Sequence, residues 1–131
     1  MRIEVPMLPG AALNPNARNH WTGRYTAARD LRKATWAVAY NANPDHEVLF
    51  EKAKISVTFV YKSHQVTPDP DNAVAMLKPA LDGLVDAKIL RDDTRHHVSY
   101  VLPFDYEVDP ERAPLTVIDI GEGKTDAESK D

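Results

Sequence analysis

A nine-residue run, Ala53–Tyr61 (AKISVTFVY), places the strongest constraint on how this chain can fold. Apolar residues occupy alternate positions from Ile55 to Tyr61, so in an extended backbone they share one face. β-branched and aromatic residues of this kind are typical of strands. The run therefore predicts a central strand with one face in the core.

Helical patterns flank this strand on both sides. The first predicted helix extends from Thr22 to about Tyr40, and its inward face carries Ala28, Leu31, Thr35, Val38 and Ala39. The second extends from Asn72 to Asp86, and its inward face carries Val74, Leu77, Leu81, Leu84 and Val85. Each helix therefore has one apolar side that has to be buried.

Alternation also predicts strands at residues 2–7, 98–102 and 115–120, and the turn-rich segment FDYEVDPERAP is a candidate hairpin. The resulting order is βαβαββ, which lacks the regular alternation of a doubly wound fold. We predict an α+β single domain in which two α-helices pack on one mixed four-stranded β-sheet.

The length of 131 residues fits one domain, which we place at residues 1–120, followed by a disordered acidic C-terminal tail at 121–131. Cysteine is absent, which excludes disulfides and thiolate zinc sites. No apolar run is long enough to span a bilayer, and the first residues lack the apolar core of a secretory signal. We expect a soluble cytoplasmic protein without a membrane partner.

The formal net charge of -4 argues against a nucleic-acid partner, but the charge is unevenly distributed. Residues 1–65 hold nine Lys and Arg against five Asp and Glu, whereas residues 66–131 hold seven against fifteen. Part of the acidic excess is a candidate metal site, and part is the tail. The candidate DNA contacts lie in the first half: Asn16, Arg18, His20, Arg24, Arg29, Arg32 and Lys33. A surface loop followed by a solvated helix face is the alternative interpretation.

Two acids one residue apart, Asp69 and Asp71, precede the second predicted helix. Pro70 biases Asp69 toward an extended backbone, in which residues i and i+2 point to the same side. We expect both carboxylates to converge on a Mg²⁺ ion, with Asp71 also capping the helix. The alternative is that Asp-Pro-Asp-Asn is only a turn with an N-cap.

A second acidic pair, Asp92 and Asp93, lies beyond the helix. The helix would be about 21 Å long, and the seven residues 87–93 span at most about 24 Å. Either this segment doubles back along the helix, or Asp93 meets acids of a second subunit. Lys78 lies four residues before Asp82, so it either reaches a phosphate oxygen or pairs with Asp82.

Together these residues resemble the RusA-type Holliday junction resolvases, the endodeoxyribonuclease RusA family of bacteria and their phages. The family pattern is Asp-x-Asp-Asn, a Lys four residues before an Asp, and a later Asp-Asp pair. It is matched here by Asp69, Asp71, Asn72, Lys78, Asp82, Asp92 and Asp93. The loop LNPNARNHW is similar to the family's Asn-rich opening segment, and the resemblance covers about residues 1–120. About three more residues separate Asp71 from Lys78 than in the family's short form.

The resemblance implies a homodimeric, Mg²⁺-dependent endonuclease, with Mn²⁺ as a substitute ion. Such an enzyme resolves four-way (Holliday) DNA junctions by paired symmetric nicks, in DNA recombination and repair, in a bacterial or phage-infected cell. By carry-over, Asp69, Asp71 and Asp93 would be metal ligands and catalytic residues. Lys78 would be a catalytic contact to the phosphate, and Asp92 is a further candidate ligand.

Two other functions remain open. A non-catalytic DNA-binding or host-interaction protein that keeps the fold would fit the acidic surface. A hydrolase of a small phosphorylated substrate would need a closed pocket, and the sequence has no phosphate-cradling Gly-rich loop. Cutting that depends on Mg²⁺ separates a nuclease from a DNA-binding protein.

Overall fold

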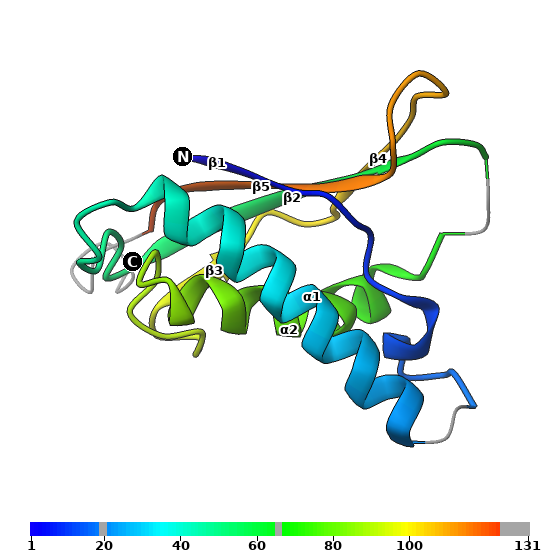
Figure 1. Ribbon diagram of the computed structural model, residues 1–131, viewed down its shortest axis with the longest axis horizontal. Coiled ribbons are helices and arrows are strands. Elements are labelled where there is room, and N and C mark those ends of the chain that lie inside the picture. Colours follow the sequence, from blue (N-terminus) through cyan, green and yellow to red (C-terminus); the bar gives the residue numbers. More distant parts are fainter. Residues whose placement is uncertain (19–20, 65–66, 124–131) are drawn as a thin grey trace.

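One mixed β-sheet and two long α-helices form two layers in the computed structural model (Figure 1). Residues 1–18, 21–64 and 67–123 are described. The strands are β1 (Arg2–Val5), β2 (Ala53–Tyr61), β3 (Val98–Tyr100), β4 (Asp105–Val108) and β5 (Leu115–Glu122). The helices are α1 (Trp21–Ala42) and α2 (Pro70–Asp86), with a short 3-10 helix η1 (Ala11–Leu13) before them. The predicted α+β fold is confirmed.

Strand β2 is central, as predicted. It pairs antiparallel with β5 along most of its length, and β5 pairs antiparallel with β1. On its other side β2 has two short parallel neighbours: β3 opposite Ala53–Ile55 and β4 opposite Thr58–Tyr61. One edge of the sheet is therefore made of two strands, with residues 101–104 between them.

The sheet has five strands where four were predicted. The additional strand, β4, lies within the turn-rich segment that was a candidate hairpin, but it pairs with β2 and not with β5. Its Tyr106 ring packs against Phe59, at 5.5 Å between centroids, and against Tyr61, at 6.0 Å. Aromatic packing against β2 thus holds this segment in the sheet.

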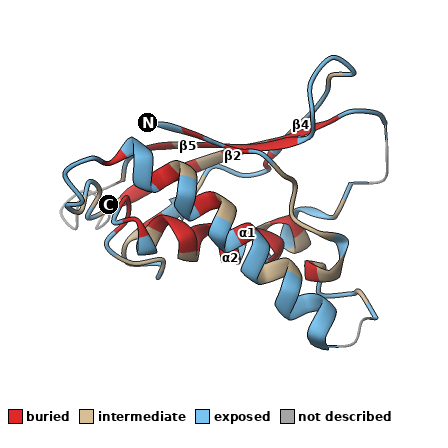
Figure 2. Cartoon of the chain, viewed as in Figure 1, coloured by how far each residue is buried: buried red, intermediate tan, exposed pale blue. Residues whose placement is uncertain are grey.

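Both helices cover the same face of the sheet, so the core lies between the two layers. Figure 2 shows buried residues concentrated on α2 and on the strands, whereas the first half of α1 is largely exposed. The expected apolar faces are confirmed. Fully buried residues of this core include Ile3, Val5, Leu31, Ile55, Leu77, Leu81, Leu84 and Ile118.

The two helices approach each other closely at Gly83 of α2. A Cβ atom at this position would lie 2.6 Å from the backbone oxygen of Arg32 and 3.0 Å from the Cβ of Thr35. The Arg32 guanidinium also makes two hydrogen bonds to the carboxylate of Asp86, at 2.6 and 2.9 Å. The absence of a side chain at Gly83 allows α1 and α2 to pack closely, and the Arg32–Asp86 ion pair links the two helices.

The ends of the elements differ slightly from the prediction. β5 continues through Gly121 to Glu122, past the predicted domain end at residue 120, because both residues still pair with β2. Residues 124–131, most of the predicted tail, lie outside the described residues. Among the residues that are described, no helix is long and apolar enough to cross a membrane.

Candidate active site

The first turn of α2 carries the Asp-Pro-Asp-Asn motif. The helix begins at Pro70, and Asp69 is its N-cap residue, with extended backbone angles (φ -58°, ψ 152°) and no side-chain capping bond. Asp71 already lies in the first helical turn, so the prediction that it caps the helix is wrong. The predicted extended backbone of Asp69 is confirmed, but the chain is not extended from Asp69 to Asp71, because Pro70, whose fixed φ suits the first position of a helix, already begins α2.

A charged cluster lies farther along α2. The Lys78 ammonium donates a hydrogen bond to Asp82 at 2.6 Å and another to the carboxylate of Asp93. Asp93 belongs to the segment between α2 and β3, which therefore doubles back along the helix. Of the two routes considered for Asp93, this is the one observed within a single chain.

Backbone pairing with the residues just before β2 holds this returning segment in place. Phe50 donates its N–H to the carbonyl of Ile89 at 3.0 Å, and Arg91 donates its N–H to the carbonyl of Phe50 at 3.1 Å. The Arg91 side chain pairs with Glu51 at 2.6 Å. Lys88 adopts a positive φ of 63° where the chain reverses. The position of Asp93 thus depends on contacts with residues about 40 positions earlier in the chain.

The contact between Lys78 and Asp93 favours the charged form of both groups. The hydrogen bond from Lys78 lowers the pKa of Asp93 below its ordinary value, although partial burial opposes the shift. Burial lowers the pKa of Lys78, but hydrogen bonds to Asp82 and Asp93 outweigh burial and raise it. Asp92 stabilises the turn, because its carboxylate accepts the N–H of Asp93 at 2.7 Å.

The acids therefore form two groups along α2. Asp71 precedes Lys78 by seven residues, which is about 10 Å along a helix axis. In the described ranges no three His, Asp or Glu side chains lie close enough together to hold one metal ion. The three-acid ligand set, Asp69, Asp71 and Asp93, does not gather in this arrangement. Asp69 and Asp71 alone still offer the one or two carboxylates that Mg²⁺ commonly takes beside waters and phosphates, so the metal site remains a prediction.

Asp82 is the residue of this cluster that matched the family pattern and a helix pair but was predicted neither as a metal ligand nor as a catalytic residue. Its carboxylate joins that of Asp93 around Lys78 and lies 4.0 Å from a guanidinium nitrogen of Arg32. The spacing of four residues from Lys78 was the available signal. The closeness of Asp82 to Asp93 could not be predicted from the sequence, because it depends on the path of the segment that returns along α2.

Several predicted DNA contacts have partners within the chain. Arg24 donates to the carbonyls of Ala12, Asn14 and Ala17 at 3.3 to 3.5 Å and so fixes the N-terminal loop. Arg32 is bound to Asp86, as described above.

The other predicted DNA contacts differ in their surroundings. Arg29 pairs with Asp30 at 3.4 Å. The backbone N–H of Asn16 donates to the side chain of Asn14 at 2.9 Å. Arg18 and Lys33 are exposed, and His20 lies outside the described residues. The role of this set in DNA binding remains a prediction.

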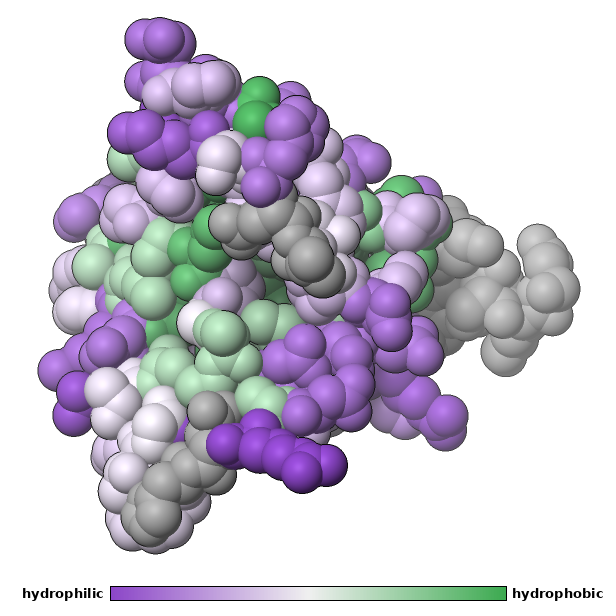
Figure 3. Space-filling model, turned by 90° about the vertical axis from the view of Figure 1, so that its right-hand side faces the viewer, coloured by the Kyte–Doolittle hydropathy of each residue, from purple (hydrophilic) through white to green (hydrophobic). Residues whose placement is uncertain are grey.

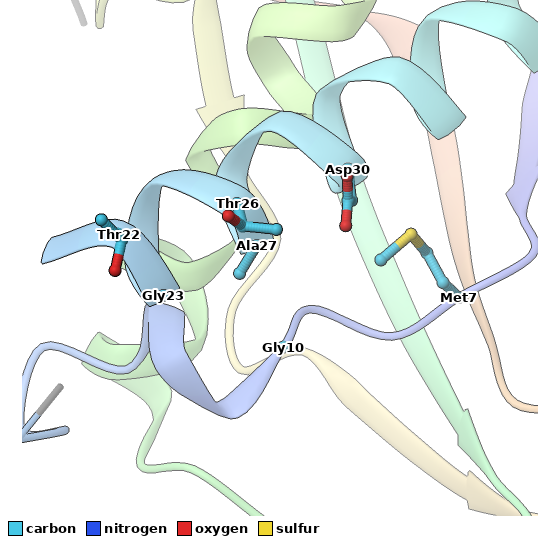
Figure 4. Close-up of a pocket in the computed structure, with 7 residues that line it drawn as sticks. All are labelled: Met7, Gly10, Thr22, Gly23, Thr26, Ala27 and Asp30. Atoms are coloured by element: carbon cyan, nitrogen blue, oxygen red, sulfur yellow. The ribbon is translucent and has the colours of Figure 1, made fainter. Parts of the chain in front are cut away.

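Figure 3 shows the end of the molecule where the helices begin, with hydrophobic side chains in the middle of the face and hydrophilic ones around them. A pocket of about 500 Å³ lies between the chain at Met7 and Gly10 and the first turns of α1 (Figure 4). Small side chains of α1 line it, and among the described lining residues Asp30 is the charged one. A carboxylate repels phosphate, so this pocket adds nothing to a phosphate-binding site.

Comparison with known proteins gives one relative. An uncharacterized protein of Xylella fastidiosa is 35% identical to this chain over 95 residues, which cover 72% of this chain and 61% of that protein. The chain thus spans about three fifths of the length of the relative it matches. No protein-family model matches the chain, and no solved structure matches it.

Proposed function

We propose that this protein is a Mg²⁺-dependent endonuclease that cuts four-way DNA junctions by paired symmetric nicks, in recombination and repair. The observation that supports this most is the return of Asp93 along α2 to Lys78. Asp93 thereby joins Lys78 and Asp82 on one side of the helix whose N-cap is Asp69 and whose first turn carries Asp71.

The chemistry of these groups suits phosphodiester hydrolysis. The first turn of α2 presents backbone N–H groups, which favour a phosphate oxygen near Asp69 and Asp71. Lys78 carries the cation that can contact a phosphate oxygen of the strand, and Asp82 and Asp93 hold it in position. A bound Mg²⁺ ion, or Mn²⁺ in its place, would polarise the scissile phosphate and lower the pKa of the attacking water. Asp92 orders the turn that presents Asp93.

Two equivalent cuts in a two-fold junction call for a two-fold pair of active sites, so we propose a homodimer as the functional form. Its branched DNA substrate places the protein in the cytoplasm of a bacterial or phage-infected cell. Because the net charge is -4, binding to DNA would depend on the first half of the chain, where Lys and Arg outnumber Asp and Glu. The five basic candidates there are all exposed: Arg18, Arg24, Arg29, Arg32 and Lys33.

A non-catalytic protein that binds DNA or a host protein is the second candidate. The observation in its favour is that the described acids of one chain form no group of three around a metal ion. Arg24 and Arg32, two of the predicted DNA contacts, have partners within the chain, which favours the host-protein form of this candidate over the DNA-binding form.

The test is cleavage of an end-labelled synthetic four-way junction, with Mg²⁺ and with a chelator. We expect paired nicks only with the metal, and a loss of rate of about 100-fold in Asp71→Asn and in Asp93→Asn. Asp45→Asn is the matched control, because Asp45 is an exposed acid in the loop after α1 and should cut as wild type. Wild-type protein that binds the junction but leaves it intact with both Mg²⁺ and Mn²⁺ would refute the proposal and favour the second candidate.

A further inference from the structure

A second pocket, of about 660 Å³, lies at the carboxyl ends of β2 and β4. Its aromatic wall consists of Tyr61 and Tyr106, whose rings are nearly parallel, with 19° between their planes and 6.0 Å between their centroids. Val108 and Pro110, just beyond the ring of Tyr106 in the sequence, complete the apolar part of the lining. The volume lies within the range of pockets that hold small organic ligands.

The remaining lining residues that the structure describes are polar. Ser63, His64 and Thr67 supply hydroxyl and imidazole groups that both donate and accept hydrogen bonds. Within the described part of the chain, neither a carboxylate nor a lysine or arginine side chain lines this pocket. A planar, uncharged ligand with hydrogen-bonding edges fits this lining better than a free phosphate does. Nucleobases have these properties, and proteins bind unstacked bases on tyrosine rings.

The pocket shares a wall with the acidic start of α2. The Tyr106 hydroxyl donates a hydrogen bond to the carbonyl of Pro68 at 3.2 Å, and Pro68 directly precedes Asp69. Burial raises the pKa of Tyr106, and the negative charge of Asp69 raises it further. A nucleotide whose base entered the pocket would therefore lie next to Asp69 and the start of α2.

We infer that this pocket receives one unstacked nucleobase of the DNA strand that is to be cut, with the base stacked beside Tyr106 and its edge facing His64. The inference rests on the proposed endonuclease function, and it gives the pocket a role in choosing where the strand is cut. The base must leave its stack to enter, which costs least at a branch point, where stacking is already interrupted.

The test is a substitution that fills the pocket with a larger side chain. Val108 lines it and is 39% exposed, so Val108→Trp can occupy the space from the solvent side. Val101→Trp is the matched control, because Val101 is an equally exposed valine, at 42%, that follows β3 on the same sheet edge and does not line the pocket. His64→Ala removes the imidazole from an exposed position and covers the case in which Val108→Trp fails to fold.

The probe is a four-way junction with 2-aminopurine in place of each base next to the branch point in turn. With a chelator present, wild-type protein should change the fluorescence at one position, because that base leaves its neighbours. Val108→Trp should abolish this change and lower junction affinity about tenfold, as expected for one lost stacking contact. Val101→Trp should do neither.

Failure of the pocket and failure of the nuclease give different results. The pocket holds no base if wild-type protein changes the fluorescence at no position. The same conclusion follows if Val108→Trp and His64→Ala give the wild-type fluorescence change and cut as wild type does. In either case, Mg²⁺-dependent cutting still supports the endonuclease. If the fluorescence change is present and sensitive to Val108→Trp but no metal permits cutting, the pocket stands and the protein is a binder of branched DNA.

Discussion

Replacing Gly83 with alanine tests the closest contact between the two helices. The new Cβ would lie 2.6 Å from the backbone oxygen of Arg32, 3.0 Å from the Cβ of Thr35 and 3.1 Å from the backbone nitrogen of Trp36. Ordinary van der Waals contact begins at 3.4 Å, so α1 and α2 would have to separate by roughly 0.8 Å at this point. Backbone atoms cannot move aside as the end of a long side chain can.

Two opposing effects set the size of the change. In an unhindered helix, alanine in place of glycine stabilises by about 1 kcal/mol. Overpacking a core costs about 1–3 kcal/mol, and a clash with backbone lies at the upper end of that range. We therefore expect Gly83→Ala to lower the free energy of unfolding by about 2 kcal/mol. For a chain of this length that corresponds to a melting temperature lower by about 8 °C.

Urea unfolding, followed by tryptophan fluorescence and circular dichroism, measures this loss. Gly121→Ala is the matched control, since a Cβ there meets nothing within 4 Å, and its stability should stay within about 0.5 kcal/mol of wild type. If Gly83→Ala is as stable as wild type, or more stable by the helix-propensity gain, the helices do not approach as closely as described.

Three further predictions concern polar contacts. Asn43→Ala should cost about 2 kcal/mol in urea unfolding, because the buried amide donates to two backbone carbonyls at 3.0 and 3.1 Å. A double-mutant cycle of Arg32→Ala and Asp86→Ala should give a coupling free energy of at most about 1 kcal/mol, because the two side chains are 50% and 36% exposed. A larger coupling would mean that solvent screens this ion pair less than its exposure indicates. The hydrogen bond from Arg91 lowers the pKa of Glu51 in the folded protein. This contact therefore stabilises the fold above the pKa of an unfolded glutamate, about 4.3, and its contribution is lost as the pH falls through the lower pKa of the folded state. The difference in urea midpoint between wild type and Glu51→Gln should therefore be present at pH 7 and shrink in acid, and a difference that grows in acid would contradict the assignment.

The regular elements could be predicted because their side chains report burial directly. The alternation in Ala53–Tyr61 and the helical spacing of Leu77, Leu81 and Leu84 each place one apolar face toward the core, and these faces are buried. β4 was missed because prolines and acids surround its few apolar residues, and its partner β2 lies more than 40 residues earlier. Pairing at that distance in the sequence leaves no local signal.

The candidate site could be predicted only in part. The four-residue spacing of Lys78 and Asp82 indicates their ion pair, and Pro70 was an available signal for a helix that begins before Asp71. The meeting of Asp93 with Lys78 depends on the pairing of Phe50 with the segment that follows α2, which is a tertiary contact. Chain-length arithmetic showed only that Asp93 could return, not where it would lie.

The divided edge of the sheet limits how this protein can associate with itself. β3 and β4 leave an interruption at Val101–Phe104, and the opposite edge, β1, is four residues long. Neither edge offers a long unbroken row of free N–H and C=O groups on which a strand of another molecule could be added. A second copy would therefore have to bind through side chains of helices, of loops or of the sheet face that the helices leave uncovered, and such an interface can be altered by point mutation without breaking strand pairing.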